Sequence, residues 1–186
     1  QAAVPLIRAL SKRFPDREIL VTTVTPTGAE RVRARFGDSV HHAYLPFEFP
    51  HAVNRFFRST NPDAALVMET EIWPNLYRGC GIRHIPLILV SARISPKSIP
   101  GYRKLLPLIR ETLSHGIIIA SQSQDDADRF LSLGAAPDRA REKVCVPMVL
   151  PFRSTWIMAL LLSRALDVHL ADRHAPLGQV GLRLRH

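Results

Sequence analysis

Two kinds of apolar segment alternate along most of the chain. Short runs rich in β-branched and aliphatic residues, such as ILVTTVT and GIIIAS, are typical of buried strands. Between them, apolar residues recur at the spacing of a helix with one buried face. The predicted strands cover 19–25, 40–46, 64–68, 86–92, 116–121 and 143–146, and the predicted helices cover 2–13, 29–36, 50–58, 76–80, 102–113 and 124–133. This order predicts an α/β fold: a Rossmann-like parallel sheet with helices on both faces.

Turn and capping residues mark several of the boundaries. The segment 26–28, Pro-Thr-Gly, separates the first strand from its helix, and Gly37 ends that helix. Ser123 is the expected N-cap of the helix over 124–133, Asp126 stands at the capping-box position, and Gly134 is the expected stop. The turn and capping residues therefore agree with the element boundaries that hydrophobic periodicity predicts.

The two ends of the chain depart from this alternation. A doubly wound sheet ordinarily begins with a strand, whereas this chain begins with a helix, so the first strand is expected to be missing. After Val146 an apolar stretch is followed by a tail of His, Arg and Leu with weak periodicity. We expect residues 1–146 to form one domain, incomplete at its N-terminus. We expect 147–186 to be a poorly ordered tail outside the fold, such as a frameshifted gene end would encode.

Composition and charge narrow the class of protein. The 186 residues are 46% hydrophobic and 22% charged, as in globular domains, and the net charge is +9. Such a charge attracts polyanions, and because the arginines form no run, an anionic membrane surface is favoured over nucleic acid. Cys80 and Cys145 have no zinc-site spacing, and no apolar stretch reaches the ~20 residues of a membrane span. We expect a cytoplasmic, metal-free protein that contacts a membrane from the side.

The strongest candidate for chemistry is METEIWPN, residues 68–75, at the carboxyl end of a predicted strand. Its two carboxylates, Glu69 and Glu71, could supply a general base or stabilise charge in a transition state. A structural alternative is that Glu71 caps the following helix, with Trp73 and Pro74 packing its first turn. Both interpretations are open at this point.

Two further loops follow strands and should lie at the same edge of the sheet. Thr25, Thr27 and Gly28 stand where a strand turns into a helix, which suits an anion or an ordinary turn. Arg93, in the polar sequence SARIS, could hold a phosphate or carboxylate bidentately, or could belong to a solvated loop. Neither GxGxxG nor GxxxxGK[ST] occurs in the chain.

Taken together, the motifs TTVTPTGAERV, YLPFEFP, METEIWPNL, IPLILVSARIS, GYRKL and RFLSLGA resemble one family over about residues 1–146. It is the family of 3-deoxy-D-manno-octulosonic acid (Kdo) transferases. The resemblance implies the N-terminal, acceptor-side half of a two-domain GT-B glycosyltransferase. That half binds the lipid A precursor (lipid IVA) at the cytoplasmic face of the bacterial inner membrane, and the other half binds the donor CMP-Kdo.

The resemblance also implies a mechanism for lipopolysaccharide core synthesis. Family members invert the anomeric carbon without a metal or cofactor, and a glutamate deprotonates the acceptor hydroxyl. Glu69 matches the position that stabilises the transition state. The residues expected to bind substrate are Thr25, Thr27, Gly28, Glu71, Asn75 and Arg93.

The chain departs from the family pattern at two places. The catalytic base lies in a Gly-Glu pair that would fall before Gln1, and the family's lysine-containing motif is replaced by residues 147–152. We therefore expect this chain alone to be an inactive fragment. One alternative is a non-catalytic basic module that binds anionic lipid or nucleic acid. Another GT-B enzyme, such as a sugar-nucleotide epimerase, is disfavoured by the TPTG and METEIWPN motifs.

Overall fold

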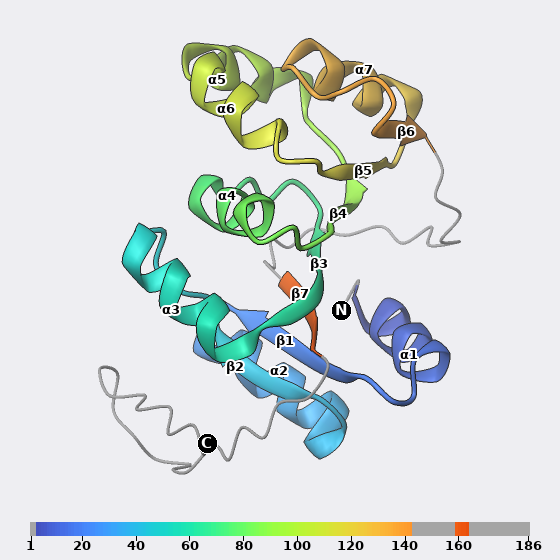
Figure 1. The fold of residues 1–186 in the computed structure, drawn as a ribbon. Helices are drawn as coiled ribbons and strands as arrows, with labels where there is room; N and C mark the ends of the chain where they lie inside the picture. The colour runs from blue at the N-terminus through green and yellow to red at the C-terminus, as the bar shows by residue number, and fades with distance from the viewer. Residues whose placement is uncertain (1–2, 143–158, 164–186) are drawn as a thin grey trace.

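The computed structural model describes residues 3–142 and 159–163, which form one sheet flanked by helices (Figure 1). The strands are β1 Glu18–Thr23, β2 His41–Tyr44, β3 Pro62–Met68, β4 Leu87–Ala92, β5 Ile118–Ser121, β6 Ala140–Glu142 and β7 Ala159–Ser163. The α-helices are α1 Val4–Arg13, α2 Pro26–Phe36, α3 Pro50–Thr60, α4 Pro74–Ile82, α5 Ile99–Lys104, α6 Leu106–Leu113 and α7 Gln124–Ser132. The strand order is β2-β1-β7-β3-β4-β5-β6.

Strand residues alternate between two hydrophobic cores, one on each face of the sheet. In β3, Ala65 and Val67 belong to the first core. Leu66 and Met68 belong to the second, as expected where successive side chains point to opposite faces. Helices α3, α4, α6 and α7 contribute to the first core, and α1 and α2 to the second. Figure 1 accordingly shows α3 and α4 on one side of the sheet and α1 on the other. The predicted Rossmann-like arrangement is confirmed.

The strand β7 lies at the centre of the sheet, between β1 and β3. It runs antiparallel to both, and Leu161 is paired with Leu20 on one side and with Ala65 on the other. The other strand pairings are all parallel. The otherwise parallel sheet therefore contains one antiparallel strand, and residues 159–163, which belong to the segment expected outside the fold, pair within it. The apolar run in β7 can pair with any open strand edge, and periodicity does not reveal which one.

Several element boundaries also differ from the prediction. The single helix expected over 102–113 is divided at Leu105 into α5 and α6. Pro107 lies in the first turn of α6, because in a continuous helix its ring would clash with the carbonyl of Arg103. The strand expected over 143–146 lies outside the described residues, and β6 pairs with β5 just before it. Within the described part of the chain, no helix is both long and apolar enough to cross a membrane.

Candidate active site at the carboxyl edge of the sheet

The chain turns sharply where β3 ends. Glu69 has φ 60°, in the left-handed region that residues other than glycine rarely adopt. Its N–H still donates to the carbonyl of Val90 at 2.8 Å, so the ends of β3 and β4 are tied together there. Sparsely populated backbone conformations of this kind cluster at functional sites. The loop over 69–73 therefore lies at the carboxyl edge of the sheet, where open α/β folds bind ligands.

Glu71 is a half-buried carboxyl group among aromatic side chains. Its burial, and secondarily the neighbouring charge of Glu69, raise its pKa above the usual value of 4.5. The indole N–H of Trp73 faces this carboxylate and opposes the rise, although it does not reach full hydrogen-bonding geometry. Burial and the charge of Glu71 likewise raise the pKa of Tyr102, on α5. A carboxyl group whose pKa is raised beside a second carboxylate is typical of acid–base sites.

The loop that carries Glu71 is fixed at its far end by a buried tyrosine. Tyr77, on α4, is fully buried, and its hydroxyl donates to the backbone carbonyl of Glu71 at 2.5 Å. Burial is also the main reason why the pKa of Tyr77 is raised. The phenol is therefore protonated at physiological pH and can donate this hydrogen bond.

Glu48, and not Glu71, caps α4. Its two carboxylate oxygens accept from the backbone N–H groups of Asn75 and Leu76, at 2.8 and 3.0 Å. The side-chain amide of Asn75 donates in return to the carbonyl of Glu48 at 2.8 Å. The alternative in which Glu71 serves as the cap is therefore wrong. Asn75 was expected to bind substrate, and its amide is already engaged within the protein.

The turn after β1 is closely packed. The hydroxyl of Thr25 accepts from the N–H of Gly28 at 3.1 Å and so acts as the N-cap of α2. A Cβ added to Gly28 would lie 3.1 Å from the Cβ of Thr23, which explains the glycine. Thr27 is exposed. These contacts are those of an ordinary strand-to-helix turn, and only Thr27 of this group has a side chain directed to solvent.

A partly buried histidine lies beneath this turn. The ring of His42 is 2.9 Å from the hydroxyl of Thr23, and burial, assisted by the charge of Arg33, lowers its pKa to about 4. The imidazole is therefore neutral at physiological pH and acts as a hydrogen-bonding partner rather than a cation.

The structure brings together only part of the predicted site. Glu69, Glu71 and Arg93 follow the neighbouring strands β3 and β4, whereas the turn over 25–28 follows β1, beyond β7. Arg93 is exposed. Among the described residues, no three His, Cys, Asp or Glu side chains lie close enough to hold a metal ion.

Sequence reasoning missed the residues that support this loop. Glu48 reaches α4 from 27 positions earlier, and no local motif indicates that contact. The tyrosines Tyr77 and Tyr102 appear in the sequence only as core residues of amphipathic helices. Their contribution to Glu71 depends on tertiary packing.

Glu71→Gln is expected to stabilise the protein at pH 7, by less than about 1 kcal/mol because the group is partly exposed. The raised pKa means that the folded chain keeps this proton to a higher pH than the unfolded chain. Wild-type stability therefore falls as the pH rises from 4.5 through the folded pKa. The stabilisation by Glu71→Gln should disappear at about pH 4, where Glu71 is largely protonated in both the folded and the unfolded chain. Urea unfolding of the wild type and the variant at pH 7 and pH 4 measures the difference.

The matched control is Glu30→Gln, which changes an exposed carboxylate on α2. It should leave the free energy of unfolding within about 0.5 kcal/mol at both pH values. An equal gain for Glu71→Gln at both pH values would show that ionisation of Glu71 is not its cause.

Comparison with known proteins identifies the family of this chain. Residues 1–144 match the family model described as 3-deoxy-D-manno-octulosonic-acid transferase (kdotransferase). The chain is similar to the 3-deoxy-D-manno-octulosonic acid transferases of Haemophilus influenzae, with 42% identity over 72% of the chain, and of Bordetella pertussis, with 34% over 73%. It is 37% identical, over 73% of its length, to a probable mitochondrial member from Arabidopsis thaliana.

The same alignments show what share of each relative's length matches this chain. They cover 31% of the Haemophilus influenzae and Arabidopsis thaliana proteins and 32% of the Bordetella pertussis protein, so the chain spans about a third of their length. The family model nevertheless matches well over half of this chain, and the resemblance seen in its motifs is confirmed. The chain therefore belongs to the 3-deoxy-D-manno-octulosonic acid transferase family.

Proposed function

We propose that this chain is the acceptor-binding part of a Kdo transferase that moves Kdo from CMP-Kdo to the lipid A precursor in lipopolysaccharide core synthesis. The observation that carries the proposal is the carboxylate pair Glu69 and Glu71 on a fixed loop at the carboxyl edge of the sheet. Family membership over residues 1–144 supports the same assignment.

In the proposed reaction a base removes the proton from an acceptor hydroxyl, whose oxygen bonds to the anomeric carbon of Kdo as CMP departs with the electrons of the broken bond. No metal or cofactor takes part. Glu69 stabilises the charge that develops in this step, and its left-handed backbone fixes the direction of the side chain. Glu71, the neighbouring carboxyl with raised pKa, orients acceptor hydroxyls. In this proposal residues 3–142 supply the acceptor side, and turnover also needs a part that binds CMP-Kdo.

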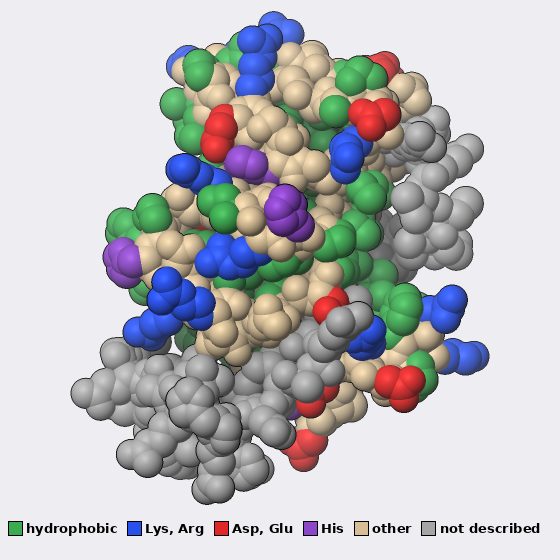
Figure 2. Space-filling model, in the orientation of Figure 1, with side chains coloured by type: hydrophobic (Ala, Val, Ile, Leu, Met, Phe, Trp, Pro, Cys, Tyr) green, Lys and Arg blue, Asp and Glu red, His purple; other side chains and the backbone are tan. Residues whose placement is uncertain are grey.

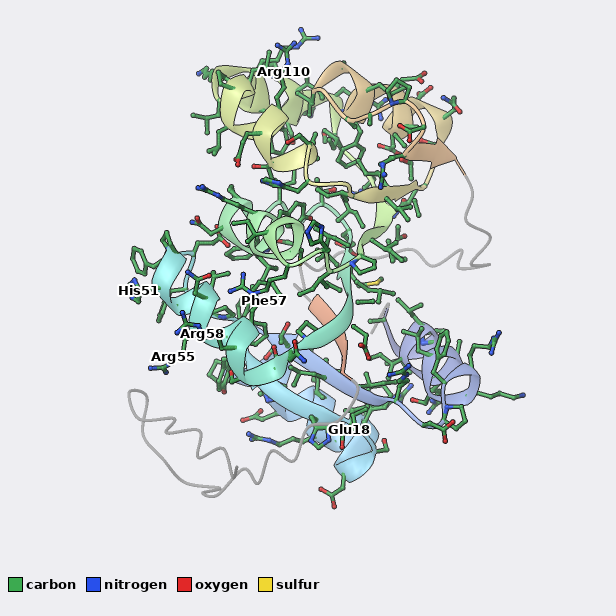
Figure 3. All side chains as sticks on the ribbon, in the orientation of Figure 1. Glu18, His51, Arg55, Phe57, Arg58 and Arg110 are labelled. Atoms are coloured by element: carbon green, nitrogen blue, oxygen red, sulfur yellow. The ribbon has the colours of Figure 1, made fainter. Side chains whose placement is uncertain are left out.

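The surface at the start of α3 supports an anionic membrane as a partner. Phe47 and Phe49 precede the helix with 81% and 58% of their surface exposed, and Phe49 stacks on His51. Figure 2 shows Lys and Arg side chains gathered over α3. Figure 3 places Arg55 and Arg58 on the side of α3 away from the sheet. Exposed aromatics beside basic residues are typical of segments that rest on anionic lipid headgroups.

Removal of both aromatic side chains, Phe47→Ala with Phe49→Ala, is expected to weaken binding to anionic vesicles at least about tenfold. In the wild type the two rings move out of water into the headgroup region of the bilayer, and this transfer stabilises the bound state. In the variant only the attraction between the basic residues of α3 and the anionic lipid remains. Vesicle flotation over a salt series measures the change. Vesicles that contain lipid IVA should bind more tightly than phosphatidylglycerol vesicles of equal charge.

Ile82→Ala is the matched control, because Ile82 is also a large exposed apolar side chain, at 64%, but lies at the end of α4. It should bind vesicles as the wild type does. The alternative of a nucleic-acid-binding module predicts tighter binding to duplex DNA than to vesicles, with a steep salt dependence. That result, or no preference for lipid IVA over phosphatidylglycerol, would contradict the proposed function.

A further inference from the structure

The loop after β4 is held to the end of β5 by a residue that the site described above does not include. Ser91 lies in the left-handed region, with φ 58°. The side-chain amide of Gln122 donates to both the carbonyl and the hydroxyl oxygen of Ser91, at 3.1 and 3.0 Å. The backbone N–H of Gln122 donates to the carbonyl of Ala92 at 2.9 Å. These bonds compensate for an unfavourable backbone conformation at Ser91.

A second attachment holds the other end of the same loop. A carboxylate oxygen of Asp126, on α7, accepts from the buried N–H of Ile94 at 2.9 Å. Arg129 donates to the carbonyl of Ile94 at 3.3 Å and to Asp126 at 3.0 Å. Ile94 itself is buried, with 2% of its surface exposed. Both polar backbone groups of this residue are therefore fixed from α7.

Arg93 lies between these two attachments, and its own side chain is exposed. Within the described part of the chain it makes no hydrogen bond or ion pair. A guanidinium group on a fixed backbone can bind the two oxygens of an anion in parallel, because less conformational freedom remains to be lost on binding. The arrangement is that of an anion receptor whose backbone is already ordered.

We propose that Gln122 and Asp126 are positioning residues that hold the loop over 91–94, so that Arg93 binds an oxyanion of a substrate at the carboxyl edge of the sheet. The inference rests on the proposed function, which provides two sources of such an oxyanion: a phosphate monoester of the acceptor and the carboxylate of the transferred sugar. Gln122 acts only through the loop and does not contact the ligand.

The test is a titration of the ¹⁵N-labelled chain with glucosamine 1-phosphate and, separately, with free Kdo, monitored in the wild type and in every variant at the backbone amide resonances of residues 91–94. Arg93→Gln should weaken binding of the recognised probe at least about tenfold. Gln122→Ala should weaken it about three- to tenfold, because the loop must then be ordered on binding. Gln122 is the better position to test, since Asp126 is buried and also interacts with Ser123 at the start of α7.

Two controls separate positioning from a general loss of stability. Gln124→Ala removes an exposed amide that donates to Asp128 instead, and it should bind as the wild type does. The double variant Arg93→Gln with Gln122→Ala should bind no more weakly than Arg93→Gln alone, because Gln122 is proposed to act through Arg93. A purely structural role for Gln122 would not produce this non-additivity.

Each other outcome has a definite meaning. If the wild type binds a probe and Gln122→Ala binds it within twofold, the positioning role is wrong while the proposed function stands. The same holds if Arg93→Gln binds as the wild type does. If the wild type binds neither probe, the acceptor-binding function and this inference are both overturned.

Discussion

Leu161→Pro is expected to abolish cooperative folding, because Leu161 pairs with strands on both sides at the centre of the sheet. Proline has no N–H to donate to the ladder and does not fit a central strand. The loss should be at least about 3 kcal/mol, a large part of the 5–15 kcal/mol by which domains are ordinarily stable. It would also leave β1 and β3 with unpaired edges that promote aggregation.

Urea unfolding followed by circular dichroism and size-exclusion chromatography measure this effect. The matched control is His51→Pro, because His51 lies in the first turn of α3, where the backbone N–H has no partner within the helix. It should remain folded, within about 1 kcal/mol of the wild type. Unchanged unfolding of Leu161→Pro would show that β7 does not hold the two parts of the sheet together.

Glu48→Ala is expected to destabilise the protein by about 2 kcal/mol, the combined effect of a lost helix cap and two charge-assisted hydrogen bonds. The N–H groups of Asn75 and Leu76 would lose the carboxylate, and the favourable charge at the N-terminus of α4 would disappear. For a chain of this size the midpoint of thermal unfolding should fall by about 4–8 °C.

The same substitution should also loosen the loop that carries Glu71, since α4 begins directly after it. Hydrogen exchange of the amides over 70–76 should therefore accelerate more than exchange in β5, which β4 separates from β3 in the sheet. Glu30→Ala, at an exposed position on α2, should change neither quantity. A fall in the unfolding midpoint smaller than about 2 °C would contradict the capping role of Glu48.

Most of the fold could be predicted because local chemistry and tertiary structure agree along residues 3–142. The N-cap at Ser123 is an example: its hydroxyl accepts from the N–H of Asp126 at 3.2 Å, as the motif predicts. Asp126 departs from the usual capping box, because its carboxylate accepts from the Ser123 hydroxyl and from Ile94 of a distant loop. Hydrophobic periodicity carries no information about such contacts.

The candidate site was predictable in place but not in detail. Glu69 and Arg93 could be assigned to one edge of the sheet because parallel strands all end there. The residues that hold these loops could not be predicted, because Glu48 and Gln122 make their contacts across many intervening residues. The left-handed conformations of Glu69 and Ser91 could not be predicted either, because neither residue is a glycine. Tertiary contacts impose backbone strain of this kind, and the local sequence pattern does not predict it.

The central position of β7 has a consequence for the order of events during synthesis. Two groups of strands lie on opposite sides of β7: β2 with β1, and β3 with β4, β5 and β6. In the chain β7 comes after both groups. As the polypeptide leaves the ribosome, these two groups of strands can form early, but the sheet cannot close until residue 163 has emerged. Closure then joins residues far apart in sequence, which makes it slow and leaves two strand edges open in the nascent chain. A chaperone that binds extended apolar strands would meet its substrate in that interval.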